Sequence, residues 1–375
     1  MLTIKPVDGA NDVDDWLEAQ ARVYADDPAW IAPLRMAEKE RISPKHNPFF
    51  SFGRAQLFVA YQNGAPVGRI SAHINDAALK HSDQTTGHFG FFECIDDPQA
   101  AHGLLDAAAK WLKQQGMAAV AGPFSFSINE DLGLLVEGYE VPPALMSSHA
   151  RPWMARHAED WGLRKAIDLF AYRMKPSEPP EVLTRLAALA SRDPKITVRP
   201  MDMSNYTRDV QLIFDIYNDA WSENWGFIPF SDQEIAKLGK EMRPIMRGKF
   251  GRFVELDGEP VAMIIVLPDI NRVIAPFHGR LLPLNWAKLG LEIMRDRWTT
   301  ARVPLLGIRK THRRPQVAAA LLSLLVAEVL ELGRSYDLDW VEFSWVLETN
   351  TAMTRLAEEI AGPPCRVYRM YEREI

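Results

Sequence analysis

The chain has 375 residues and a formal net charge of −6, and 47% of its residues are hydrophobic while 25% are charged. This length predicts two hydrophobic cores of about 150–200 residues each, and the composition excludes a chain that stays disordered. The negative charge argues against an anionic partner, so we expect no membrane partner and no general binding of nucleic acid, although a local basic patch is compatible with it.

Several blocks of sequence occur twice in the same order. Residues 4–8, Ile-Lys-Pro-Val-Asp, return as Val-Arg-Pro-Met-Asp at 198–202. Residues 58–67 return at 253–261, and each block predicts two strands joined by an Asn-Gly or Asp-Gly turn. The repetition predicts two copies of one domain.

The two copies are assigned to residues 1–175 and 195–375. A linker over 176–194 joins them, and its first residues are rich in proline and charge. Unequal spacing between matching blocks predicts one insertion in each copy. The first insertion spans 127–152, and the second lies between residues 271 and 304.

A long helix is predicted at the same place in both copies. Residues 96–116 match 313–333 without a gap, and each segment has Pro-Gln near its start and glycine at its end. Two aspartates, Asp96 and Asp97, precede the first helix, whereas arginines occupy the equivalent positions of the second. Because like charges repel, only the second helix start suits a phosphate.

The segment Arg-Arg-Pro-Gln-Val-Ala at 313–318 follows a predicted strand, and Asn350 follows a later one. In these residues and in its order of elements, the chain resembles the GNAT superfamily of acyl-CoA-dependent N-acyltransferases. The resemblance implies an α/β fold with a mixed α+β sheet, present as two tandem GNAT-like domains. It also implies acetyl-CoA or another acyl-CoA as donor, held in the second copy by backbone N–H groups at the helix start. The donor-binding residues implied in this way are Ile308, Lys310, Arg313, Arg314, Gln316, Val317, Ala318 and Asn350.

The chain departs from the superfamily pattern at two places. Gln316 replaces a loop glycine, and Pro315 lacks an N–H donor. The tyrosine that often serves as general acid is replaced by Ala357 in the second copy and by Ala158 in the first. A second interpretation is therefore open, in which Pro-Gln is only a helix start and the duplicated fold binds a ligand or a protein without catalysis.

Two segments are candidates for the acceptor site. Residues 217–230 are dense in aromatic side chains, which suit either an apolar pocket or a hydrophobic core. The first insertion carries a polar cluster that suits either a cover over a cleft or a structural lobe. The acceptor candidates are Tyr217, Trp221, Trp225, Phe227, Asn129, Glu130, Tyr139 and His149.

Formation of an amide from a thioester needs a neutral amine and therefore a base. The resemblance points to a carboxylate on the central strands of the second copy, so Glu342 and Glu348 are candidate catalytic residues, with His312 as a third. Each is also compatible with a structural or solvated position.

The predicted function is transfer of an acyl group from acyl-CoA to a small-molecule amine, in the cytoplasm and without a metal. A further alternative is aminoacyl or peptidyl transfer from a carrier such as tRNA, for which Lys310, His312 and the two arginines offer a local basic cluster. The only cysteines, Cys94 and Cys365, have neither the spacing of a zinc site nor that of a disulfide framework.

Overall fold

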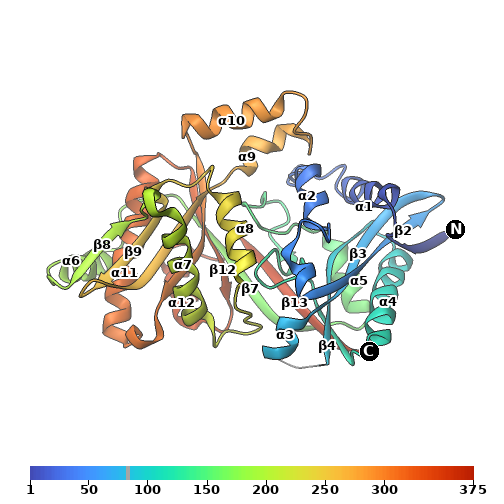
Figure 1. The fold of residues 1–375 in the computed structure, drawn as a ribbon, viewed down its shortest axis with the longest axis horizontal. Helices are drawn as coiled ribbons and strands as arrows, with labels where there is room; N and C mark the ends of the chain where they lie inside the picture. Colours follow the sequence, from blue (N-terminus) through green and yellow to red (C-terminus); the bar gives the residue numbers. More distant parts are fainter. Residues whose placement is uncertain (82–84) are drawn as a thin grey trace.

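Each half of the chain passes through the same order of strands and helices in the computed structural model, which describes residues 1–81 and 85–375 (Figure 1). The strands of the first half are β1 (Leu2–Pro6), β2 (Gly53–Gln62), β3 (Ala65–Asn75), β4 (Thr86–Cys94), β5 (Ala119–Gly122), β6 (Leu134–Glu137) and β7 (Arg164–Met174). Its helices are α1 (Ala10–Val23), α2 (Arg35–Arg41), α3 (Asp76–His81), α4 (Pro98–Gln114) and α5 (Pro152–Asp160), with a 3₁₀ turn at Pro48–Ser51.

Helix α6 (Glu181–Ala190) joins the two halves. The strands of the second half are β8 (Ile196–Pro200), β9 (Gly251–Leu256), β10 (Glu259–Pro268), β11 (Thr300–Ile308), β12 (Trp340–Leu347) and β13 (Arg366–Glu374). Its helices are α7 (Tyr206–Trp221), α8 (Asp232–Met242), α9 (Asn271–Ile274), α10 (Asn285–Arg295), α11 (Pro315–Ser335) and α12 (Thr351–Ala361). Strand β6 in the first half and helices α9 and α10 in the second lie in the two insertions that the unequal spacing predicts.

The two predicted hairpins are confirmed, and their turns explain why the sequence forms them. Asn63 and Gly64 have φ angles of 52° and 84°, and Asp257 and Gly258 have 52° and 83°. Positive φ at both central residues is the type I′ geometry, whose twist matches that of the flanking strands. Strands β2 and β3, and likewise β9 and β10, therefore pair directly across a two-residue loop.

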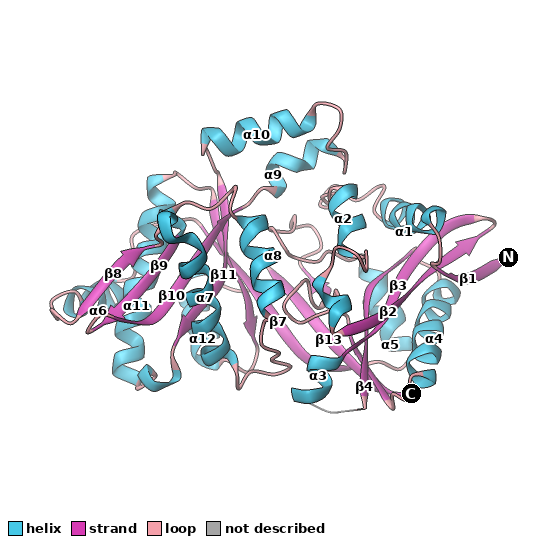
Figure 2. Ribbon diagram, viewed as in Figure 1, coloured by secondary structure: helices cyan, strands magenta, loops and turns pink. Residues whose placement is uncertain are grey.

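The strands of the described residues form one mixed sheet with helices on both faces (Figure 2). The strand order is β1-β2-β3-β4-β5-β13-β7-β12-β11-β10-β9-β8, and β6 pairs with β13 off this path. The parallel strands β11 and β12 pair only over Thr300–Val303 of β11, and beyond Val303 β11 pairs with β10 while β12 pairs with β7. The second half therefore opens between these two strands.

The closing strands of the two halves are exchanged, which the repeat alone does not reveal. Strand β7 of the first half pairs with β12, whereas β13 of the second half pairs with β5. The two exchanged strands also pair with each other along most of their length. Because the backbone groups of a closing strand are satisfied equally well by either neighbour, repeated sequence cannot specify which half receives which strand.

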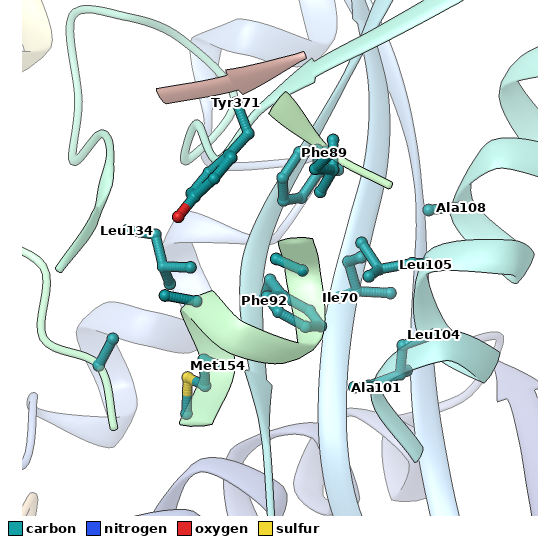
Figure 3. Close-up of a cluster of buried hydrophobic side chains, with 14 of the residues drawn as sticks. Ile70, Phe89, Phe92, Ala101, Leu104, Leu105, Ala108, Leu134, Met154 and Tyr371 are labelled. Atoms are coloured by element: carbon teal, nitrogen blue, oxygen red, sulfur yellow. The ribbon is translucent and has the colours of Figure 1, made fainter. Parts of the chain in front are cut away.

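Two large hydrophobic clusters lie on the two halves, and the exchange contributes to the first of them. In the first, Ile70 and Leu104 are fully buried, and Tyr371 reaches the same cluster from β13 of the second half (Figure 3). In the second, Ile264 and Leu325 are fully buried beside Val341 of β12. The first core thus depends on chain from both ends of the sequence, whereas the buried residues of the second come from residues 190–341 alone.

Helix α11 continues beyond Gly333, where the sequence predicts its end. A Cβ atom on Gly333 would lie 2.4 Å from Cγ of Pro176, so glycine here makes room for the linker instead of stopping the helix. Linker helix α6 also packs on α11, through Leu183 against Val326 and Leu330. Among the described helices, α11 alone is long and apolar enough to cross a membrane, but 50% of its most apolar window is buried within this fold.

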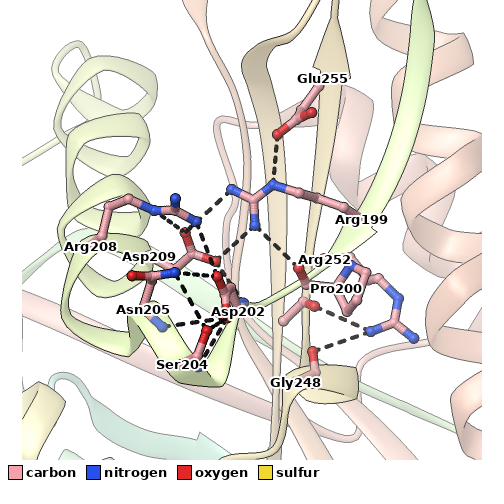
Figure 4. A network of polar contacts seen from close by, with 11 residues as sticks. Arg199, Pro200, Asp202, Ser204, Asn205, Arg208, Asp209, Gly248, Arg252 and Glu255 are labelled. Atoms are coloured by element: carbon pink, nitrogen blue, oxygen red, sulfur yellow. Dashed lines mark hydrogen bonds and ion pairs between the residues drawn. The ribbon is translucent and has the colours of Figure 1, made fainter.

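An ion-pair network fixes the start of the second half (Figure 4). Arg199 on β8 contacts Asp209 on α7 at 2.7 Å and Glu255 on β9 at 2.6 Å. Although burial raises it, hydrogen bonds from Arg199 and from the backbone N–H of Asp202 lower the pKa of Asp209. The network attaches the beginning of α7 to the sheet, which sets the positions of the aromatic side chains farther along that helix.

Candidate active site

Two adjoining cavities lie where the halves meet. The first, of about 200 Å³, is enclosed by α7, α8 and strands β10 to β12 of the second half. The second, of about 470 Å³, lies between α2, β4 and the insertion over 127–152 of the first half and α8 and α9 of the second. Both are lined by Asn129, Glu130, Leu132, Met146, Leu238 and Met242, so they share a wall made from both halves.

The first cavity is lined mainly by aromatic and aliphatic side chains. Tyr217 and Trp221 stack with ring centroids 4.8 Å apart, and Phe214 lies 4.5 Å from Phe230. The Trp221 ring reaches the sheet because Gly307 has no side chain, since a Cβ there would lie 2.6 Å from that ring. The four predicted aromatic residues, Tyr217, Trp221, Trp225 and Phe227, all line this cavity. Tyr217 and Trp221 also pack against the second core, so these side chains belong both to an apolar pocket and to a hydrophobic core.

The first insertion reaches into the second half through Asn129. Its Oδ1 accepts a hydrogen bond of 3.1 Å from the Tyr217 hydroxyl, and its Nδ2 donates to the carbonyl of Ile228 at 3.3 Å. Burial raises the pKa of Tyr217, which therefore remains a hydrogen-bond donor. The insertion thus closes the cavity of the other half rather than forming a separate lobe.

The second cavity is acidic. Among the described residues that line it, seven are carboxylic acids and three are basic. At its centre Arg41 lies 3.0 Å from Glu130, 2.8 Å from Asp131 and 3.5 Å from Glu38. Burial lowers the pKa of Arg41, but these carboxylates outweigh it and the net shift is upward. A surplus of negative charge in a concave site attracts a cation and repels a phosphate.

Glu130 is the carboxylate that lines both cavities. Burial raises its pKa, although Arg41 opposes that effect. Deeper in the second cavity Arg69 and Glu93 form a pair at 2.5 Å, and Gln20 donates a hydrogen bond of 3.0 Å to Glu93. Glu93 is therefore fully engaged, whereas Glu130 combines a raised pKa with a position at the junction.

His149 also lines the second cavity, but both of its ring nitrogens are engaged. Nε2 lies 3.0 Å from Asp27 Oδ2, and Nδ1 accepts a hydrogen bond of 3.0 Å from Arg366. Burial and the charge of Arg366 lower the pKa of His149. Tyr139, the remaining insertion candidate, packs against the first core and does not line either cavity.

A buried arginine holds the end of the insertion against the sheet. Arg302 on β11 donates hydrogen bonds of 2.6 Å to the carbonyls of Leu145 and Met146 and one of 2.8 Å to Ser344 Oγ. Its guanidinium lies over the Trp345 ring at 4.4 Å from the centroid. Because Met146 and Trp345 line the first cavity, this arginine shapes the cavity wall.

The starts of α4 and α11 differ in how far they are open to an anion, as the charges of the preceding residues predict. In the first half, Asp97 caps α4 by accepting a hydrogen bond of 2.8 Å from the N–H of Gln99, and Asp96 binds Arg156 at 2.7 Å. Helix α11 has no side-chain cap at Arg314, and Arg314 and Gln316 are exposed. Free N–H groups at an exposed helix start favour an anion.

The residues before α11 attach it to α7. Arg313 donates a hydrogen bond of 3.0 Å to the carbonyl of Ile308 and another to that of Ala220. The N–H of Lys310 donates to Asp219 at 2.8 Å, and its ammonium group lies 3.3 Å from Glu223, so the expected basic cluster is partly neutralised.

The other predicted donor residues lie at the same end of the second half. Val317 is exposed at the helix start and Ala318 is half-buried, while Asn350 caps α12 by accepting a hydrogen bond of 3.3 Å from the N–H of Met353. Asn350 is therefore committed to its own helix.

The three predicted catalytic residues do not line the two cavities. Glu342 is fully buried, 2.8 Å from Arg173 of the exchanged strand β7. Glu348 accepts a hydrogen bond from the N–H of Asp168 and contacts Lys165 at 2.7 Å. His312 lies in the 3₁₀ turn before α11, beside Thr311 at 2.9 Å. The carboxylates beside Arg41 in the second cavity are a different set, which consists of Glu38, Glu130 and Asp131.

The chain is similar to two curated proteins over nearly its whole length. It is 37% identical over 369 residues to "Protein YghO" of Escherichia coli, covering 97% of this chain and 93% of that protein. It is 36% identical over 376 residues to "Bacterial ceramide synthase" of Caulobacter vibrioides, covering 100% and 98%. No known family profile matches the sequence.

Solved structures share the fold. A tandem GNAT protein from the clavulanic acid biosynthesis pathway has a TM-score of 0.57 at 14% identity, with 100% of this chain and 98% of that chain covered. A GCN5-related N-acetyltransferase from Sphaerobacter thermophilus has a TM-score of 0.52 at 13% identity, with 100% and 95% covered. The fold is thus that of the GNAT acyltransferases, as the sequence resemblance implies.

Proposed function

Because this chain belongs to the family of protein YghO and the bacterial ceramide synthase and has the GNAT fold, we propose that it transfers a long acyl group from acyl-CoA to the amine of a long-chain amino alcohol. The observation that carries this proposal is the junction of an apolar cavity with an acidic one. An acyl chain suits the first cavity, and an amine, which is protonated at neutral pH, suits the second. The product is an amide of the ceramide type.

The donor is assigned to the second half. Its phosphates would lie at the exposed start of α11. Just before that start, Arg313 donates a hydrogen bond to the carbonyl of Ala220, and the next residue, Trp221, lines the first cavity. The acyl chain would therefore enter that cavity beside Trp221. The first half cannot supply an equivalent site, because Asp97 occupies the start of α4.

The reaction forms one C–N bond and breaks one C–S bond. The amine nitrogen attacks the thioester carbonyl, and the CoA thiolate leaves and takes up a proton. The ammonium group of the acceptor must first lose a proton, and Glu130 is the carboxylate we assign to accept it. Burial favours the protonated form of Glu130, so it is a stronger base than an ordinary carboxylate.

The proposal is tested by incubating the purified chain with palmitoyl-CoA and sphinganine and following release of the CoA thiol. Thiol release that requires both substrates is expected. Binding of palmitoyl-CoA without any release, under conditions in which the protein is folded, would instead support the ligand-binding alternative.

Arg314→Glu is expected to raise KM for palmitoyl-CoA by about tenfold while changing kcat little, because an anionic side chain at the helix start repels the phosphates. Steady-state kinetics at varied donor concentration measures the effect. The matched control is Asp97→Asn at the equivalent helix of the first half, since asparagine also caps a helix. An equal increase in KM for the Asp97→Asn variant would contradict the assignment of the donor phosphates to the second half alone.

Val210→Phe is expected to shift donor preference toward short chains. Val210 lines the first cavity next to Gly239 on α8, so a larger side chain fills the space between the two helices. The value of kcat/KM should fall about tenfold for palmitoyl-CoA and little for octanoyl-CoA. Val182→Phe, on the exposed side of α6, is the control. An unchanged ratio of the two donors would place the acyl chain elsewhere.

A further inference from the structure

The insertion of the second half exposes large apolar side chains around helix α10. Leu282 is 71% exposed, Leu284 68%, Trp286 57%, Leu291 41% and Met294 75%. We call these five residues the α10 surface. None of the residues of α10 is buried, and the helix projects from the edge of the molecule (Figure 1). Contiguous exposed apolar residues on a soluble domain mark a surface that another body covers.

Helix α10 is amphipathic. Successive helical residues turn by about 100°, so Trp286, Leu291 and Met294 fall on one broad side and Lys288, Glu292 and Arg295 on the other. Only part of the apolar side is used by the fold, since Ile293 packs against the second core. The indole N–H of Trp286 donates to the carbonyl of Pro283 at 2.9 Å, so its exposed ring has no unsatisfied donor. Such a helix can lie in the plane of a membrane interface.

The charge around this surface is opposite to that of the whole chain. Residues 272–297 contain five arginines and lysines and two acidic residues, whereas the net charge of the chain is −6. Arg280, Lys288 and Arg297 are exposed, and within the described residues their side chains form no ion pair. An apolar face bordered by unpaired cations complements anionic lipid headgroups.

The insertion that carries the α10 surface also lines the acidic cavity. Ile274 of α9 lines that cavity, as do Leu34 and Ala37 at α2. The N–H of Arg35 donates a hydrogen bond of 2.9 Å to the carbonyl of Gly279, which links the insertion to α2. Met36, beside that hydrogen bond, is 56% exposed. Exposed apolar side chains thus occur both on the α10 surface and at α2, where Leu34 and Ala37 line the cavity.

We propose that the α10 surface docks the protein on an anionic membrane, with Trp286, Leu291 and Met294 inserted among the lipids and Arg280, Lys288 and Arg297 at the headgroups. This proposal departs, for this local region, from the expectation of no membrane partner that the net charge of the whole chain gives. Docking would place the cavity mouth at the lipid surface. That use of docking rests on the proposed function, whereas membrane binding itself does not.

The test is co-sedimentation of the full chain with sucrose-loaded vesicles of phosphatidylcholine, with and without phosphatidylglycerol. Binding to the anionic vesicles is expected, with weaker binding to phosphatidylcholine alone. Trp286→Glu combined with Met294→Glu should reduce the bound fraction at least about tenfold, because two charges oppose insertion. Lys288→Glu with Arg297→Glu should abolish the preference for anionic lipid.

The matched control is Val182→Glu with Leu189→Glu on α6. These residues are 63% and 57% exposed, and α6 lies at the opposite end of the molecule from the first half (Figure 1). The control should bind vesicles like the parent, and circular dichroism should show that all variants are folded. Equal binding of vesicles by the parent and by the Trp286→Glu, Met294→Glu variant would overturn the proposal. It would also be overturned if the parent did not bind anionic vesicles but formed dimers that this variant does not form.

Discussion

Glu130→Gln is expected to lower kcat of acyl transfer by about 100-fold or more while changing KM for the donor little, because a glutamine cannot accept the proton of the ammonium group. Glu130 is assigned this role because it lines both cavities and its pKa is raised by burial. The glutamine can still contact Arg41, so the wall of the cavity should be preserved. Steady-state kinetics with sphinganine as acceptor measures the loss.

Glu348→Gln is the control for this prediction. Glu348 is a candidate base from the sequence, but it contacts Lys165 and the N–H of Asp168 outside the two cavities. Its variant should keep activity within about twofold of the parent, as expected for a surface ion pair. The pH profile separates the roles further. Activity of the parent should rise with pH as Glu130 loses its proton, and that limb should be absent from the Glu130 variant. A loss confined to the Glu348 variant would reverse the assignment.

Arg302→Leu is expected to lower the free energy of unfolding by roughly 3 kcal/mol, because it leaves three acceptors around a fully buried guanidinium without their donors. Those acceptors are the carbonyls of Leu145 and Met146 and the hydroxyl of Ser344. Urea unfolding followed by tryptophan fluorescence measures the change. Ser344→Ala removes one partner only and should cost about 1 kcal/mol.

The Arg302→Leu variant also tests whether the first insertion, over 127–152, is part of the site. Since Arg302 holds the chain at Met146, a folded Arg302→Leu protein should bind palmitoyl-CoA less tightly than the parent. If the stability and the affinity of this variant both equal those of the parent, the insertion is not held in the way described.

The sequence predicts the features that depend on neighbouring residues. The Asn-Gly and Asp-Gly turns require a local φ that these residues adopt, so both hairpins follow from the sequence. The difference between the capped start of α4 and the uncapped start of α11 also follows from the sequence, because Asp97 and Arg314 directly precede these two helices. The resemblance to the GNAT superfamily was carried by such local patterns together with their order.

The features that the sequence misses depend on contacts between distant residues. Glu38 and Arg41 lie on a short helix whose alternating charges look like a solvated face, and only the fold brings Glu130 beside them. Likewise, the sequence does not pair Glu342 with Arg173, because Arg173 belongs to the exchanged strand of the other half. The helix end expected at Gly333 failed for the same reason, because the linker that passes over it comes from elsewhere in the chain.

The most direct test of the account is mass spectrometry of the product formed from palmitoyl-CoA and nitrogen-15-labelled sphinganine. The account predicts one new N-palmitoyl amide that retains the label, formed by the parent protein and nearly absent from the Glu130→Gln protein. Formation of the same labelled amide at equal rates by both proteins would contradict the assigned base, and absence of any labelled amide from the folded parent would contradict the proposed reaction itself.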